Sequence, residues 1–132
     1  MKPGNQETSK GIKHIFEAAG YTFDGLKCAF KETAFLLECG FGLAFFIVAW
    51  LLPFSVEQIG ILTLAWLGVM VVELLNTAIE AVVDLASPEY HELAKRAKDL
   101  ASAAVAVAIF ANVILWAAFL WDVYCFDLIG QI

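Results

Sequence analysis

The stretch E-L-L-N-T-A-I-E-A-V-V-D, residues 73–84, decides how this chain folds. It closes a long apolar run that begins at residue 59, and it carries four polar side chains: Glu73, Asn76, Glu80 and Asp84. At about 100° per residue, all four lie within about 60° of Glu73 around a helix. An ionisable group near a bilayer centre costs about 2.5–3.5 kcal/mol. Such a stripe therefore predicts a functional surface that faces protein, ions or a water-filled cavity.

The composition is typical of a membrane protein. The chain has 132 residues, of which 61% are hydrophobic, whereas soluble domains are roughly 45–50% apolar. Three stretches, 33–52, 59–83 and 100–121, are long enough to cross a hydrocarbon core of about 30 Å. A soluble three-helix bundle would need polar faces that these runs lack. The sequence predicts an all-α membrane protein with three transmembrane helices in a single domain over 1–132.

A fourth helix is predicted at about residues 10–30, before the first span. Apolar side chains recur there at helical spacing, at Ile12, Ile15, Phe16, Ala19 and Phe23, with charged residues on the other side. This pattern predicts an amphipathic helix on the inner membrane surface. We expect Gly20 and Gly25 to break or bend it, and the polar residues 1–9 to be disordered.

The distribution of charge predicts the topology. All eight basic residues precede the first span or lie between the second and third, although the net charge is −6. The positive-inside rule places the N-terminus and the second loop in the cytoplasm and the C-terminus outside. No basic patch supports nucleic-acid binding. Cys28, Cys39 and Cys125 lack metal-ligand spacing and are expected to be small apolar packing residues.

The segment after the stripe supplies complementary chemistry. In S-P-E-Y-H-E-L-A-K-R-A-K-D-L-A-S, Lys98 and Ser102 share a helix face and Asp99 lies beside them. Carboxylates that hold Mg²⁺, a lysine that offsets phosphate charge and a base for a hydroxyl proton are the groups needed for phosphoryl transfer. The same stripe could instead be a polar seam of an oligomer or the lining of an ion path. Asn112, deep in the third span, is expected to be an interhelical hydrogen-bond partner.

The stripe together with E-Y-H-E-L-A-K-R-A-K-D-L-A-S-A-A-V resembles the signature of the small bacterial integral-membrane diacylglycerol kinases. A-A-G-Y-T-F-D-G-L-K at residues 18–27 and E-T-A-F-L-L-E at residues 32–38 also match. The resemblance implies an ATP- and Mg²⁺-dependent kinase of the bacterial inner membrane that converts diacylglycerol to phosphatidic acid. It also implies a homotrimer whose active sites are shared between subunits.

The resemblance implies a role for each matching residue. Glu73 corresponds to the general base, Asn76 is its neighbour, and Lys98 completes the catalytic set. Glu32 and Glu80 correspond to the metal ligands. The nucleotide-binding positions are Tyr21, Glu32, Glu80, Glu89, Tyr90, His91, Lys98 and Asp99. The lipid-site positions are Ala18, Ala19, Gly20, Tyr21, Phe23, Glu38, Glu73 and Ser102.

Two alternatives stay open at this point. The related undecaprenol kinases share the core motif, and lipid preference does not follow from these residues. A membrane packing or channel subunit without enzymatic activity could use the same polar seam. The chain departs from the family pattern at His14, where a basic residue is expected, and at Leu36 and Leu37, which replace more polar residues.

Overall fold

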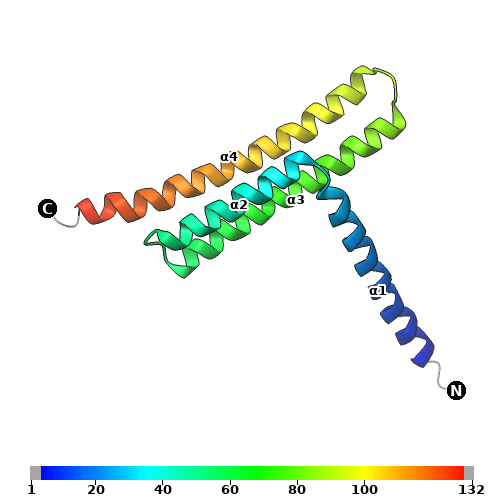
Figure 1. The fold of residues 1–132 in the computed structure, drawn as a ribbon, viewed down its shortest axis with the longest axis horizontal. Coiled ribbons are helices and arrows are strands. Elements are labelled where there is room, and N and C mark those ends of the chain that lie inside the picture. The colour runs from blue at the N-terminus through cyan, green and yellow to red at the C-terminus, as the bar shows by residue number, and fades with distance from the viewer. Residues whose placement is uncertain (1–3, 130–132) are drawn as a thin grey trace. The chain divides into compact units, whose positions relative to one another are not determined.

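The computed structural model describes the backbone of residues 4–129 and the side chains of residues 13–125. This part of the chain is all-helical: α1 is Gly4–Ala29, α2 is Thr33–Leu51, α3 is Val56–Ala86 and α4 is Glu92–Ile129 (Figure 1). Three of these helices, α2, α3 and α4, are long and apolar enough to cross a membrane. The predicted class, three spans preceded by one further helix, is confirmed.

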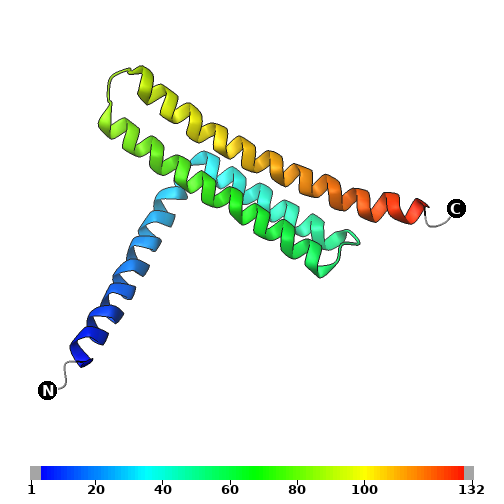
Figure 2. The ribbon, with the colours of Figure 1, turned by 180° about the vertical axis from the view of Figure 1, so that it is seen from behind.

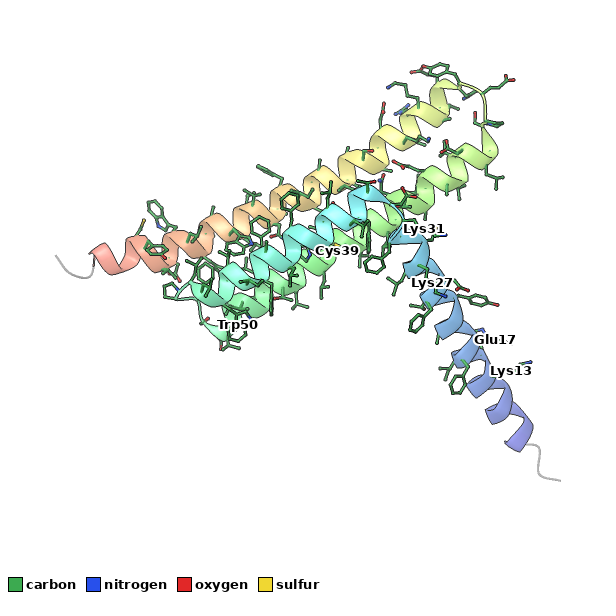
Figure 3. All side chains as sticks on the ribbon, viewed as in Figure 1. Lys13, Glu17, Lys27, Lys31, Cys39 and Trp50 are labelled. Carbon is green, nitrogen blue, oxygen red and sulfur yellow. The ribbon has the colours of Figure 1, made fainter. Side chains whose placement is uncertain are left out.

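The helix α1 is continuous from Gly4 to Ala29, through both Gly20 and Gly25. The predicted break is wrong, because one glycine in a helix costs only about 1 kcal/mol relative to alanine. The predicted disorder of residues 1–9 is also wrong from Gly4 onward, and residues 1–3 lie outside the described part. Ion pairs Lys13–Glu17 (3.8 Å) and Asp24–Lys27 (3.6 Å) support the exposed polar face (Figure 3).

The helices α3 and α4 form an antiparallel hairpin and pack side by side (Figures 1 and 2). At the start of α3, Ser55 forms a capping box, in which the backbone amide nitrogen of Gln58 donates to Ser55 Oγ at 3.2 Å. Gln58 Nε2 also donates to Asp122 Oδ2 at 3.2 Å, which joins the first turn of α3 to α4. Both helices extend beyond the predicted spans 59–83 and 100–121, because their polar ends continue the same helix.

The core among the spans lies toward the turn between α2 and α3. Its buried residues are Ala49, Phe54, Ile59 and Leu62. Phe45 of α2 contacts the rings of Trp66 and Trp116, with centroid distances of 6.4 and 5.5 Å. The remaining apolar side chains of α2, α3 and α4 are mostly exposed in the single chain. They are therefore available to lipid or to further copies of the chain.

Candidate functional site

The polar stripe on α3 is present as predicted, and it reaches into the interior. Glu73 is 5% exposed and is the one buried carboxylate of the described residues. One turn further along, Asn76 Nδ2 donates a hydrogen bond to Glu80 Oε1 at 3.4 Å. Because a buried charge needs a partner, a second charged or polar group is expected close to Glu73.

Glu38 of α2 faces this stripe. The carboxyl groups of Glu38 and Glu73 lie close enough to repel one another, and so do those of Glu73 and Glu80. Glu38 Oε2 and Asn76 Oδ1 are buried and have no hydrogen-bond partner among the described residues. The cluster therefore presents acceptor oxygens that a hydroxyl donor or a cation could satisfy.

These oxygens are ligands that Mg²⁺ prefers. The described part of the chain nevertheless holds no group of three His, Cys, Asp or Glu side chains arranged to hold a metal ion. The chain divides into two compact units, Met1–Leu36 and Leu37–Ile132. The half-buried Glu80 belongs to the second unit, whereas the exposed Glu32 belongs to the first. The donor set fits Mg²⁺ in chemistry, and further ligands are needed to complete a site.

A cavity of about 290 Å³ lies at the turn between α3 and α4. Its polar lining contains four of the predicted nucleotide-binding residues, Glu89, Tyr90, His91 and Lys98. The tertiary structure thus gathers residues from the end of α3, the loop and the start of α4 into one concave surface. Its charged lining consists of two lysines, Lys95 and Lys98, and two carboxylates, Asp84 and Glu89, so an anionic ligand would have to compete with carboxylates for the lysines.

Ion pairs hold both lysines of this cavity. Lys98 Nζ lies 2.5 Å from Asp84 Oδ1 across the hairpin, and Lys95 Nζ lies 2.5 Å from Asp99 Oδ2 along α4. The sequence reasoning missed Lys95 as a lining residue and Asp84 as the partner of Lys98. The spacing of four residues between Lys95 and Asp99 indicated their ion pair, but it did not indicate that Lys95 lines a cavity. No sequence signal indicated the second, which depends on the path of the hairpin.

The loop side chains are held by local hydrogen bonds. His91 Nδ1 accepts from the Leu93 amide nitrogen at 3.2 Å, so a neutral His91 carries its proton on Nε2 and can donate from there. The Tyr90 hydroxyl donates to Glu92 Oε2 at 2.8 Å. This bond raises the pKa of the Tyr90 phenol above its usual value. Tyr90 therefore remains a neutral donor.

The two polar clusters lie at opposite ends of the stripe. Eleven residues separate Glu73 from Asp84, which corresponds to about 16 Å along α3. Since Lys98 pairs with Asp84, its ammonium lies at the far end from Glu73. The single chain therefore does not bring Glu73 and Lys98 together, and Asn76 and Glu80 occupy the interval.

The remaining predicted residues are exposed. Positions 18–23, including Tyr21, lie on α1, and Ser102 lies on α4. Asn112 is buried, but its Nδ2 has no hydrogen-bond partner in the described part of the chain. The expected interhelical hydrogen bond from this amide nitrogen is therefore absent. Cys28, Cys39 and Cys125 are free thiols; Cys28 is exposed, and Cys39 and Cys125 are partly buried.

Comparison with known proteins supports the resemblance that the sequence motifs indicate. The family described as prokaryotic diacylglycerol kinase matches residues 20–120. Diacylglycerol kinase of Escherichia coli K12 is 44% identical over 85% of this chain and 93% of its own length. That of Pseudomonas aeruginosa PAO1 is 39% identical over 91% and 98%. That of Helicobacter pylori 26695 is 38% identical over 88% and 91%.

Proposed function

We propose that this chain, which belongs to the prokaryotic diacylglycerol kinase family, transfers the γ-phosphoryl group of ATP to the hydroxyl of diacylglycerol. The chain is a lipid kinase with three apolar helices able to cross a membrane. The finer parts of the proposal are Mg²⁺ dependence, location in the bacterial inner membrane and reaction at the cytoplasmic face. The N-terminus then lies in the cytoplasm and the C-terminus outside.

The observation that carries the proposal is the polar stripe with its two different ends. One end holds the buried Glu73 among apolar helices, and we place the lipid hydroxyl there. The other end holds Lys98 beside a polar cavity in the loop, where a soluble nucleotide can bind. A lipid kinase needs this combination because its two substrates come from different solvents.

The reaction we assign to these residues is direct in-line transfer. Glu73 accepts the proton of the lipid hydroxyl, and the resulting oxygen nucleophile attacks the γ-phosphorus. A new P–O bond forms to the lipid while the bond to the β–γ bridging oxygen breaks, and ADP leaves with that electron pair. Asn76 orients the acidic cluster through Glu80, and Lys98 balances the negative charge of the phosphates.

The Mg²⁺ in this proposal would be held by Glu80 and Glu32, together with oxygens of the nucleotide. When bound, it would neutralise charge on the phosphates. The separation of about 16 Å between the ends of the stripe, and the lack of three metal-ligating side chains together in the described part of one chain, favour a site completed by a second copy. We propose that the copies form a homotrimer with shared sites, as the resemblance to the family implies, in which Glu89, Tyr90, His91, Asp99 and Tyr21 contact the nucleotide.

The experiment that tests this function uses the purified full-length chain in mixed micelles with radiolabelled ATP. Diacylglycerol and undecaprenol are offered in separate reactions, with and without Mg²⁺. Labelled phosphatidic acid that appears only with both ATP and Mg²⁺ is the expected product. Label transferred to undecaprenol alone would move the substrate assignment to the isoprenoid alcohol. Label in neither lipid would overturn the proposal.

A further inference from the structure

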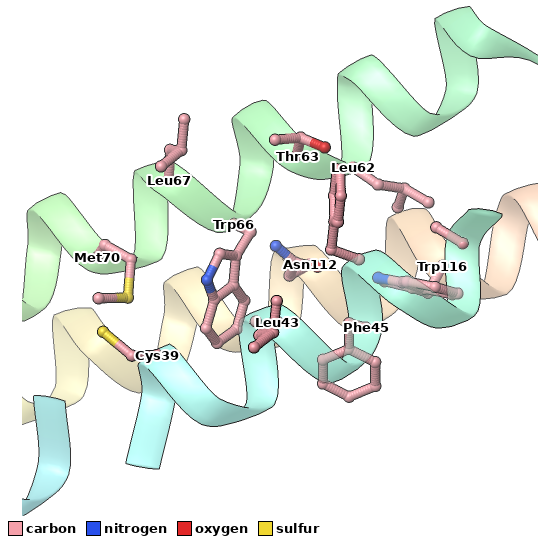
Figure 4. Close-up of a pocket in the computed structure, with 13 residues that line it drawn as sticks. Cys39, Leu43, Phe45, Leu62, Thr63, Trp66, Leu67, Met70, Asn112 and Trp116 are labelled. Atoms are coloured by element: carbon pink, nitrogen blue, oxygen red, sulfur yellow. The ribbon is translucent and has the colours of Figure 1, made fainter. Parts of the chain in front are cut away.

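A second cavity, of about 330 Å³, lies among α2, α3 and α4 and is separate from the polar loop cavity (Figure 4). Along α3 its lining runs from Leu62 to Met70, which is about 12 Å of helix. Most of the lining is apolar or aromatic, including Phe45, Trp66 and Trp116, and among the described residues it contains no acidic, basic or histidine side chain. The cavity therefore suits a neutral occupant, and the function proposed above makes no use of it.

Asn112 is the polar residue of this cavity that lacks a partner. It is 7% exposed, and its Nδ2 forms no hydrogen bond within the described part of the chain. Figure 4 shows its amide between Met70 at one end of the cavity and Trp116 at the other. The unpaired donor thus lies near the middle of the cavity and near the middle of the predicted span 100–121. Because a buried N–H group without a partner is unfavourable, a hydrogen-bond acceptor is expected here.

Water alone does not explain this cavity. A buried water needs roughly two to four polar partners, whereas Asn112 Nδ2 is the one fully buried atom of the lining that lacks a partner among the described residues. The Thr63 hydroxyl of the same lining already donates to the backbone oxygen of Ile59 at 2.8 Å. One water would also fill only about 30 Å³ of the space. The expected occupant is therefore mostly apolar and carries one acceptor.

We propose that this cavity binds a neutral molecule from the bilayer that carries a carbonyl oxygen between two apolar parts, of which a diaryl ketone is the simplest form. The carbonyl oxygen accepts a hydrogen bond from Asn112 Nδ2, and it adds no donor that would itself need a partner. The apolar parts extend toward Met70 on one side and Trp116 on the other. Aromatic parts suit this lining because rings pack favourably against the rings of Phe45 and Trp66.

The first test is photolabelling of the purified full-length chain in detergent micelles with radiolabelled benzophenone. This probe carries one carbonyl between two phenyl rings, and on irradiation it reacts with neighbouring C–H bonds. Neither ATP nor diacylglycerol is present. We expect saturable label on residues of the lining, such as Met70 and Trp116. Label that does not saturate, or that lies only on exposed residues such as Leu64, would overturn the proposal.

A second ligand and two variants isolate the hydrogen bond. Diphenylmethane has the same two rings with a methylene group in place of the carbonyl, and each unlabelled ligand is titrated for protection against labelling. Asn112→Ala should weaken protection by benzophenone about fivefold, the effect of one neutral hydrogen bond, and should leave protection by diphenylmethane unchanged. Val113→Ala is the matched control, because Val113 is 56% exposed and lies outside the lining. An unchanged benzophenone titration, or an equal loss for both ligands, would contradict the proposal.

The lipid substrate distinguishes this cavity from the kinase site. No member of the acidic cluster around Glu73 lines the cavity, so excess dioleoylglycerol should leave the benzophenone label unchanged. Loss of the label with dioleoylglycerol would assign the cavity to the lipid substrate and overturn the proposal. Since labelling requires no phosphoryl transfer, this result and the kinase assay of the proposed function can fail independently.

Discussion

Lys98 Nζ lies 2.5 Å from Asp84 Oδ1, so the start of α4 is joined to the end of α3 by an ion pair beside the loop cavity. Both side chains are partly exposed, with 38% of Lys98 and 66% of Asp84 accessible. Exposed ion pairs contribute only about 0–1 kcal/mol to stability. Asp84 therefore positions Lys98, but breaking this ion pair costs little free energy. An anionic ligand can compete with Asp84 for the Lys98 ammonium.

The first prediction concerns Lys98 itself. Lys98→Ala removes the charge that we assign to the phosphates, and a charge-assisted hydrogen bond is worth about 1.5–3 kcal/mol. We expect KM for ATP to rise at least about tenfold, measured by initial rates at saturating diacylglycerol. Lys95→Ala is the control within the same cavity, and a larger effect from it would assign the phosphate contact to Lys95.

The second prediction is that removal of the competing carboxylate strengthens nucleotide binding. Asp84→Asn keeps the side-chain shape but releases Lys98, so KM for ATP should fall several-fold. The free energy of unfolding should change by less than about 1 kcal/mol, because the pair is partly exposed. A rise in KM would instead show that Asp84 positions Lys98 for the nucleotide.

The third prediction concerns Glu73 as the general base. Glu73→Gln cannot accept the hydroxyl proton, and general-base catalysis contributes about 10²–10⁴-fold. We expect kcat to fall by this factor, while the circular dichroism and the elution volume in detergent stay unchanged. Near-normal turnover of a correctly assembled variant would remove Glu73 from this role.

The fourth prediction concerns Glu80 and the metal. Glu80→Ala should raise the Mg²⁺ concentration required for half-maximal rate, because a carboxylate ligand is lost. The measurement is a Mg²⁺ titration at saturating ATP and lipid. Glu57→Ala, a change of an exposed carboxylate in the first turn of α3, serves as the control. Identical titration curves for Glu80→Ala and the unmodified chain would count against metal binding there.

The fifth prediction is a pH dependence at Tyr90. The hydrogen bond to Glu92 raises the pKa of Tyr90 above its ordinary value of 10.0. The folded chain thus binds the phenolic proton more tightly than the unfolded chain. The stabilising contribution is present below pH 10.0 and is lost as pH rises through the folded pKa. Ultraviolet titration of Tyr21→Phe/Tyr124→Phe should show this raised pKa, and Glu92→Ala should return it toward 10.0. Glu89→Ala should leave it unchanged.

The amphipathic and apolar patterns of the sequence predict much of this fold. The three spans, the preceding helix and the alignment of Glu73, Asn76 and Glu80 on one face follow from helical periodicity, which is a local property of the chain. The boundaries were less predictable. Hydropathy finds where a helix is apolar, whereas the backbone hydrogen bonds of α3 and α4 continue into polar ends that hydropathy cannot detect.

Only the tertiary structure decided which separate segments meet. The pairing of Lys98 with Asp84, the approach of Glu38 to Glu73 and the apolar cavity around Asn112 depend on how the helices pack. Helix packing depends on the shapes of many side chains at once. At Gly42, for example, an added Cβ would overlap the Trp66 indole, so the absence of one side chain sets how closely α2 approaches α3. Periodicity assigns a residue to a face of its own helix, but contacts across helices settle what that face meets.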